Sequence, residues 1–133
     1  MLRRSHFILY VQDQNASRDF YARVLGRPAS LHVPGMTEFE LTNGAVLGIM
    51  PESGIARLLG PTVNPSTMRG AGRAELYLVV DDPADHHARA LAAGARELSP
   101  LLARDWGHRA AYSLDADGHV LAFAEVIDEA ATA

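Results

Sequence analysis

The feature that most constrains the fold of this chain is a strand-then-helix pattern that occurs twice. Residues 5–11 (SHFILYV) are apolar, β-branched or aromatic and predict a strand, and residues 15–26 predict a helix that ends at a glycine. A weaker copy follows, with a strand at 74–80 and a helix at 82–94. Two copies in 133 residues predict two half-domains that share one core, because the chain is short for two independent domains.

Each predicted helix is followed by three further predicted strands. In chain order these are 29–33, 37–41 and 45–50, and then 97–101, 109–114 and 119–126. The turn sequences Asn43-Gly44 and Asp115-Ala116-Asp117-Gly118 separate strands in the two copies. The sequence therefore predicts an α+β fold of two tandem βαβββ modules, whose curved mixed sheets surround a shared cavity that is the default binding site.

The boundaries and the inner faces of the helices follow from the same pattern. We expect one domain over residues 1–133, with module one at 5–50, a linker at 51–72, module two at 73–127 and a tail at 128–133. Asn15 and Asp82 are the predicted helix caps. The predicted inward-facing residues are Ala16, Phe20 and Val24 in the first helix and Ala84, Ala88, Leu91 and Ala92 in the second.

Composition excludes several classes of function. The formal net charge is -4, and the chain has no basic stripe of the kind that binds phosphate, so we expect no nucleic-acid partner. It has no cysteine, which excludes disulfides and cysteine zinc sites and agrees with a cytoplasmic location. Neither a signal peptide nor an apolar run of membrane-spanning length is recognisable, so we expect no membrane partner.

Several short motifs, in this order, resemble the vicinal oxygen chelate superfamily of glyoxalases, bleomycin resistance proteins and extradiol dioxygenases. They are Asp13…Ser17…Phe20-Tyr21…Leu25-Gly26, Asn43-Gly44, Trp106-Gly107 and Asp115-Ala116-Asp117-Gly118-His119. The resemblance covers residues 5 to 127 and is greatest to the uncharacterised glyoxalase-like branch. It implies the fold predicted above and a homodimer, because family members pair their modules within or between chains.

The resemblance also implies where a metal ion would bind. The family places up to four ligands on the first and last strand of each module, at positions that correspond here to His6, Gly48, Glu75 and Ala122. Gly48 and Ala122 have no donor side chain, whereas a catalytic divalent metal usually has three or more protein ligands. We therefore expect no metal and no other cofactor, with His6 and Glu75 as remnants of the site.

His6 and Glu75 are the leading candidates for functional residues. They could face each other as a charged or proton-sharing couple, with Glu75 as a general base or as an anchor for a cation. The alternatives are a structural polar pair, or an incomplete metal site that water or substrate completes. The alternation of strand side chains adds neighbours on the same faces, of which Tyr10, Met50 and Tyr77 are the better candidates for ligand contact.

Trp106, in the loop before the penultimate strand, and Arg109, the first residue of that strand, complete the predicted ligand-binding set. Trp106 could stack on a ligand at the mouth of the cavity, and Arg109 could neutralise an anionic group; packing under the loop and solvent exposure are the alternatives. The function predicted best is metal-free binding of a hydrophobic or cationic small molecule. The alternative is a lyase or dioxygenase of the superfamily, with a divalent metal or with Glu75 as the general base.

Overall fold

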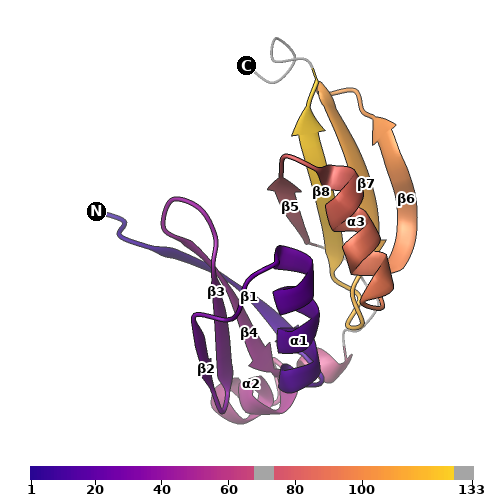
Figure 1. Ribbon diagram of the computed structural model, residues 1–133. Coiled ribbons are helices and arrows are strands. Elements are labelled where there is room, and N and C mark those ends of the chain that lie inside the picture. Colours follow the sequence, from indigo (N-terminus) through magenta and orange to yellow (C-terminus); the bar gives the residue numbers. More distant parts are fainter. Residues whose placement is uncertain (68–73, 128–133) are drawn as a thin grey trace. The chain divides into compact units, whose positions relative to one another are not determined.

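A computed structural model of the chain describes residues 1–67 and 74–127 (Figure 1). The chain divides into two compact units, Met1–Arg69 and Gly70–Ala133. Each unit contains one four-stranded sheet. The end of the predicted linker at 68–72, together with residue 73, and the predicted tail at 128–133 lie outside the described residues.

The first unit has the predicted βαβββ order and a further helix. Its elements are β1 (Ser5–Val11), α1 (Gln14–Leu25), β2 (Leu31–Val33), β3 (Met36–Glu40), β4 (Ala45–Pro51), α2 (Glu52–Leu59) and a short 3₁₀ turn (Pro65–Thr67). The strand order is β1-β4-β3-β2, with β1 parallel to β4 and the other pairs antiparallel. Asn43 and Gly44 form the predicted hairpin turn between β3 and β4, with φ of 55° and 79°.

Local sequence fixes both ends of α1, although not as predicted at the start. Asp13, rather than Asn15, is the N-cap: its carboxylate accepts the backbone N–H of Ala16 at 3.0 Å. At the other end Gly26 takes the left-handed conformation with φ of 70°, and its N–H donates to the carbonyl of Ala22.

The α1 helix covers one face of the first sheet. Gln14 donates from its Nε2 to Oγ1 of Thr37, which places the helix on the side of the sheet where Thr37 and its register partner Ile49 lie. The buried residues of α1 are Ser17, Tyr21 and Val24. The predicted inner stripe was therefore right at Val24 and wrong at Ala16, which is exposed, and Phe20 is half-buried.

The second unit repeats the strand order. Its elements are β5 (Glu75–Val79), α3 (Pro83–Ala92), β6 (Arg96–Ala103), β7 (His108–Leu114) and β8 (Val120–Val126). The order β5-β8-β7-β6, with β5 parallel to β8, matches β1-β4-β3-β2 position by position. This agreement confirms the α+β fold of two βαβββ modules with mixed sheets. The cavity that the two sheets were expected to share stays a prediction.

The helix of the second unit begins as predicted but turns a different face inward. The Asp82 carboxylate accepts the N–H of Asp85 at 3.0 Å, and Pro83 occupies the first turn. The buried residues of α3 are Pro83, His87 and Ala90. The predicted stripe was wrong for Ala84, Ala88 and Ala92, which are exposed, and Leu91 is half-buried. Within the described residues, no helix is both long and apolar enough to cross a membrane.

Candidate functional site

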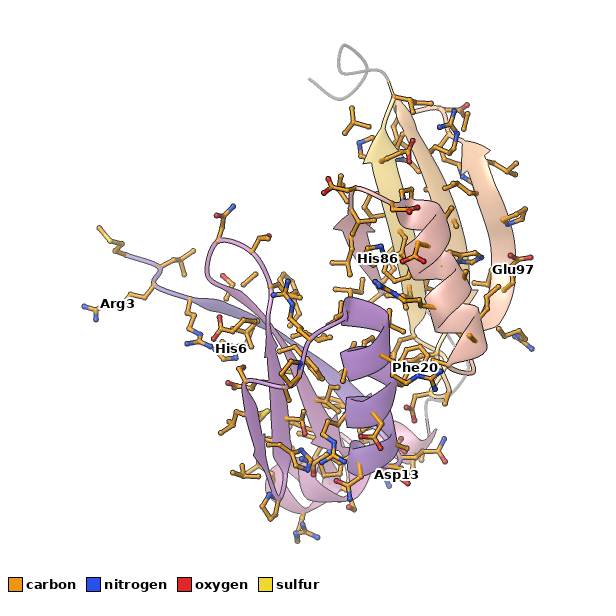
Figure 2. The ribbon with its side chains drawn as sticks, viewed as in Figure 1. Arg3, His6, Asp13, Phe20, His86 and Glu97 are labelled. Atoms are coloured by element: carbon orange, nitrogen blue, oxygen red, sulfur yellow. The ribbon has the colours of Figure 1, made fainter. Side chains whose placement is uncertain are left out.

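In the first sheet, the face opposite α1 carries the predicted residues of module one. Register partners share a face, and the pairs His6 with Val46, Ile8 with Gly48 and Tyr10 with Met50 lie on this side. His6 lies on β1 (Figure 2). Its Nδ1 is 3.4 Å from Oε2 of Glu38, a residue of β3 whose side chain is on the same face of the sheet. The His6 side chain is 35% exposed and that of Glu38 only 17% exposed, so the carboxylate is the better shielded partner.

Gly48 lies beneath the side chain of Ile8. A Cβ built on Gly48 would overlap Cδ1 of Ile8 and would lie 3.6 Å from Sδ of Met36. Hydrocarbon and thioether atoms therefore occupy the space into which a side chain at position 48 would project. This position is where the superfamily resemblance expects a metal ligand.

The residues at the expected metal positions do not fit a family-type metal centre. Gly48 offers no donor and is covered by Ile8, and Ala122 is a buried alanine on β8. Glu38 adds one carboxylate beside His6, which gives the first unit two donors at these strands. At the four expected positions only His6 and Glu75 have donor side chains, which is fewer than the usual three, and Glu38 is not at one of these positions.

In the second sheet, the face opposite α3 carries a hydrogen-bonded aromatic chain. Nε1 of Trp106 donates to Oη of Tyr77 at 2.9 Å, and Oη of Tyr77 lies 2.6 Å from Nδ1 of His108. The Tyr77 and His108 rings are stacked, with centroids 5.7 Å apart and planes inclined by 27°. Trp106 as a residue is 44% exposed, although its indole N–H is hydrogen-bonded. We call Trp106, Tyr77 and His108 the aromatic triad.

Tyr112 lies on the same face as the aromatic triad, because it shares register with Ala122, as Tyr77 does. Burial raises the pKa of the Tyr112 phenol from its ordinary value of 10.0. The negative charge of Glu75 and the Tyr77 phenol raise this pKa further, and the Arg104 guanidinium opposes them. Glu75 is exposed on the same face and is close enough to Tyr112 to act on it electrostatically.

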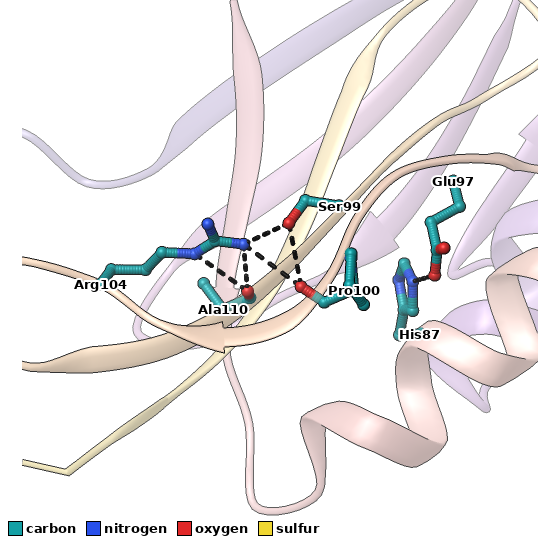
Figure 3. Close-up of polar contacts among 6 residues, drawn as sticks. All are labelled: His87, Glu97, Ser99, Pro100, Arg104 and Ala110. Carbon is teal, nitrogen blue, oxygen red and sulfur yellow. Dashed lines mark hydrogen bonds and ion pairs between the residues drawn. The ribbon is translucent and has the colours of Figure 1, made fainter.

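Arg104 holds the irregular pairing of β6 with β7 in place. Its guanidinium donates to the carbonyls of Ala110 and Pro100 and to Oγ of Ser99, the last at 2.6 Å (Figure 3). The guanidinium carbon also lies 5.1 Å from the centre of the Tyr112 ring. These bonds occur where the register shifts between Ser99 and Leu102, so Arg104 satisfies carbonyls near the disrupted part of the ladder.

Arg109 lies on the opposite face of the second sheet from the aromatic triad. Its register partner is Glu125, to which its guanidinium donates at 3.1 Å. The neighbouring register pair, Ala111 with Phe123, lies beneath α3, where the ring of His86 is 5.3 Å from that of Phe123. The structure therefore separates Arg109 from Trp106 and Tyr77.

Two further polar groups of the second unit have structural surroundings. His87, on the buried face of α3, pairs through Nε2 with Oε2 of Glu97 at 2.8 Å (Figure 3). In the turn between β7 and β8, Oδ1 of Asp115 accepts the backbone N–H groups of Asp117 and His119, and Oδ2 lies 2.8 Å from Nδ1 of His119. The potential ligand atoms of Asp115, Asp117 and His119 all lie within 4.8 Å of one another, so this turn could hold a cation. The Asp115 carboxylate is already used, however, to accept the two backbone N–H groups that close the turn.

The structure thus brings together some of the predicted site residues. His6, Tyr10 and Met50 share one face of the first sheet, and Glu75 and Tyr77 share one face of the second with Trp106. The sequence pattern did not single out Glu38 or His108. The alternation of 37–41 and the position of Glu38 opposite Gly48 could have indicated the first, whereas only the fold brings His108 to Tyr77.

Comparison with known proteins agrees with this architecture. Residues 3–123 match the family model of the Glyoxalase/Bleomycin resistance protein/Dioxygenase superfamily. The chain therefore belongs to this superfamily. None of the curated proteins compared with it matches.

Solved structures of the same fold cover nearly the whole chain. A glyoxalase-related enzyme from Fulvimarina pelagi is 26% identical, with a TM-score of 0.81 over 94% of this chain and 88% of that one. A glyoxalase/bleomycin resistance protein/dioxygenase family enzyme from Burkholderia phytofirmans PsJN is 18% identical, with a TM-score of 0.78 over 92% and 97%. TioX from Micromonospora sp. ML1 is 22% identical, with a TM-score of 0.64 over 93% and 98%.

Proposed function

We propose that the protein binds an aromatic or otherwise flat apolar small molecule, preferably a cationic one, without a metal ion. The observation that carries this proposal is the fixed but exposed indole of Trp106, which is held by its hydrogen bond to Tyr77. An aromatic ring that is already immobilised loses little conformational entropy when a ligand stacks on it. The triad therefore provides a preorganised stacking surface.

The charge on this face supports a cationic ligand. Glu75 is exposed and lies near enough to Tyr112 to influence its pKa. A carboxylate beside aromatic rings favours a positive charge, both directly and through cation–π attraction. The Arg104 guanidinium is engaged with backbone carbonyls and with Ser99, so it is committed to the protein itself.

A titration with naphthalene derivatives tests this proposal. The chain has one tryptophan, so the single indole N–H cross-peak in a ¹H–¹⁵N spectrum reports on Trp106 without assignment. We expect saturable shifts of this peak with protonated 2-(aminomethyl)naphthalene and weaker binding of 2-naphthoate. Glu75→Gln should reduce the preference for the cation, and Trp106→Ala should abolish binding measured by calorimetry. If neither compound binds saturably, the proposal is overturned.

The absence of suitable donors at Gly48 and Ala122 supports binding without a metal. One observation favours the alternative, a metal-dependent lyase or dioxygenase: Glu38 places a second donor beside His6. Nickel, zinc, manganese or iron added to metal-stripped protein should leave its thermal stability unchanged under the metal-free proposal. Stabilisation that both His6→Ala and Glu38→Gln abolish, but Asp117→Asn does not, would favour the alternative and exclude the Asp115 turn as its source.

The enzyme alternative with Glu75 as a general base is tested by turnover. A hemithioacetal and a catechol are the substrates that the superfamily suggests, and turnover of either that Glu75→Gln abolishes would replace the binding proposal. The resemblance also suggests a homodimer and a cytoplasmic location. Light scattering of the purified protein tests the first, and cell fractionation tests the second.

A further inference from the structure

One of the two hydrogen bonds of the aromatic triad has a fixed direction. The indole nitrogen of Trp106 is a donor and cannot accept, so Oη of Tyr77 must be the acceptor of the 2.9 Å bond. Tyr77 then has its own O–H to donate, and the atom 2.6 Å away is Nδ1 of His108. When this O–H donates to the neutral imidazole, Nδ1 is the unprotonated nitrogen.

A Tyr77 hydroxyl that donates to His108 would fix the tautomer of the imidazole. A neutral imidazole carries one N–H, so when Nδ1 accepts, the hydrogen is on Nε2. Within the described residues, Nε2 of His108 has no hydrogen-bonding partner, and it is not one of the buried unpaired atoms. In this tautomer the half-buried imidazole presents an N–H at the surface, beside the ring of Tyr77 and next to Trp106.

We propose that His108 is a specificity-determining residue, held by Tyr77 and Trp106 as the Nε2–H tautomer, and that it selects ligands with an oxygen acceptor beside the stacked ring. The ligand class is an aromatic ketone or a related carbonyl compound. This inference rests on the proposed stacking function and adds a polar requirement to it. Glu75 and His108 then read different groups of one ligand, a cation and a carbonyl oxygen.

The tautomer can be tested on the free protein. Long-range ¹H–¹⁵N spectra distinguish the protonated from the unprotonated imidazole nitrogen, and comparison with His108→Gln assigns the signal among the six histidines. At alkaline pH we expect His108 as the Nε2–H form. Tyr77→Phe removes the hydroxyl that fixes this form and should give a mixture of tautomers, whereas Tyr10→Phe should leave it unchanged. A predominant Nδ1–H form in the unmodified protein would overturn the inference.

A matched pair of ligands tests the selectivity. The compounds are 2-acetylnaphthalene and 2-ethylnaphthalene, which differ by a carbonyl in place of a methylene group. One hydrogen bond predicts that the ketone binds about tenfold more tightly. His108→Phe should remove this difference while retaining binding of the hydrocarbon. Equal affinities in the unmodified protein would overturn the inference and leave the stacking function intact. If neither compound binds, the inference is overturned, and the stacking function is overturned with it only if protonated 2-(aminomethyl)naphthalene also fails to bind.

Discussion

Ile8 and Gly48 are register partners on adjacent parallel strands, and the end of the Ile8 side chain occupies the space above Gly48. The residue at position 48 is therefore constrained by packing. A substitution that adds a side chain there must displace Ile8 or the nearby Met36. A metal-ligating side chain at this position would therefore require rearrangement of side chains within the first sheet.

Gly48→Ala should lower the free energy of unfolding by about 1 kcal/mol, because the added methyl overlaps Cδ1 of Ile8. The Ile8 atom is the end of a flexible side chain, which keeps the cost modest. In an Ile8→Val background, which lacks that atom, Gly48→Ala should be neutral or stabilising by up to ~1 kcal/mol. Urea unfolding of the four variants measures this coupling.

Gly54→Ala is a matched control for that cycle. Gly54 lies in α2, where a Cβ would be in ordinary contact with Pro51 at 3.5 Å, so the substitution should stabilise the helix by about 0.5–1 kcal/mol. Additive effects of the Ile8 and Gly48 substitutions would contradict the overlap described above.

Of the four tyrosines in the chain, Tyr112 should lose its phenolic proton at a higher pH than an ordinary tyrosine does. Because burial and the Glu75 charge raise its folded-state pKa, the folded protein retains this proton at pH values where the unfolded chain has lost it. The contribution to stability is thus complete below about pH 10 and is lost as the pH rises through the folded-state pKa. A titration followed by phenolate absorbance should show this high-pH deprotonation in the unmodified protein and lack it in Tyr112→Phe.

Glu75→Gln separates the causes of this shift. Removing the carboxylate should move the Tyr112 transition to lower pH without restoring it fully, because burial is the larger cause. Glu97→Gln, which changes a carboxylate paired with His87, is the control and should leave the Tyr112 transition in place.

Arg104→Lys should destabilise the protein by about 1–2 kcal/mol, because an ammonium group cannot reproduce the bonds of the planar guanidinium to Ala110, Pro100 and Ser99. Thermal or urea unfolding measures the change. The same substitution at Arg57, which is exposed on α2, should alter stability by less than ~0.5 kcal/mol. Equal stability of the two variants would show that the bonds of Arg104 are replaceable.

Asp115→Ala should cost about 1–3 kcal/mol, since Asp115 is buried and its loss leaves the backbone N–H groups of Asp117 and His119 without their carboxylate acceptor. Asp115→Asn retains one oxygen and should cost less. Asp105→Asn, in the exposed loop before β7, is the control for removing a negative charge. In chemical unfolding, Asp115→Ala should be the least stable of the three variants, Asp115→Asn should be intermediate, and Asp105→Asn should be the most stable.

The sequence predicts the features of this fold that depend on local backbone chemistry. Gly26, the Asn43-Gly44 turn and the Asp82-Pro83 helix start each have a strong intrinsic preference, and the structure places all three as predicted. Alternation along the strands likewise predicts which residues share a face. These signals need no information about residues distant in the sequence.

The features that the sequence does not predict depend on tertiary packing. His87 and Ser17 face inward although they are polar, so a stripe chosen by apolarity is displaced along each helix. The pairing of Trp106 with Tyr77 spans β5 and the loop before β7, and that of Tyr77 with His108 is set by the strand order of the second sheet. His6 and Glu38 are likewise brought together only by the order of β1, β4 and β3.

The identical strand order of the two sheets has an evolutionary consequence. If an ancestral half-length gene was duplicated, each descendant inherited the same framework and could change its open face separately. One copy now carries the ion pair of His6 with Glu38, and the other carries the triad of Trp106, Tyr77 and His108. Internal gene duplication would thus have allowed chemical specialisation of one half while the other retained the inherited architecture.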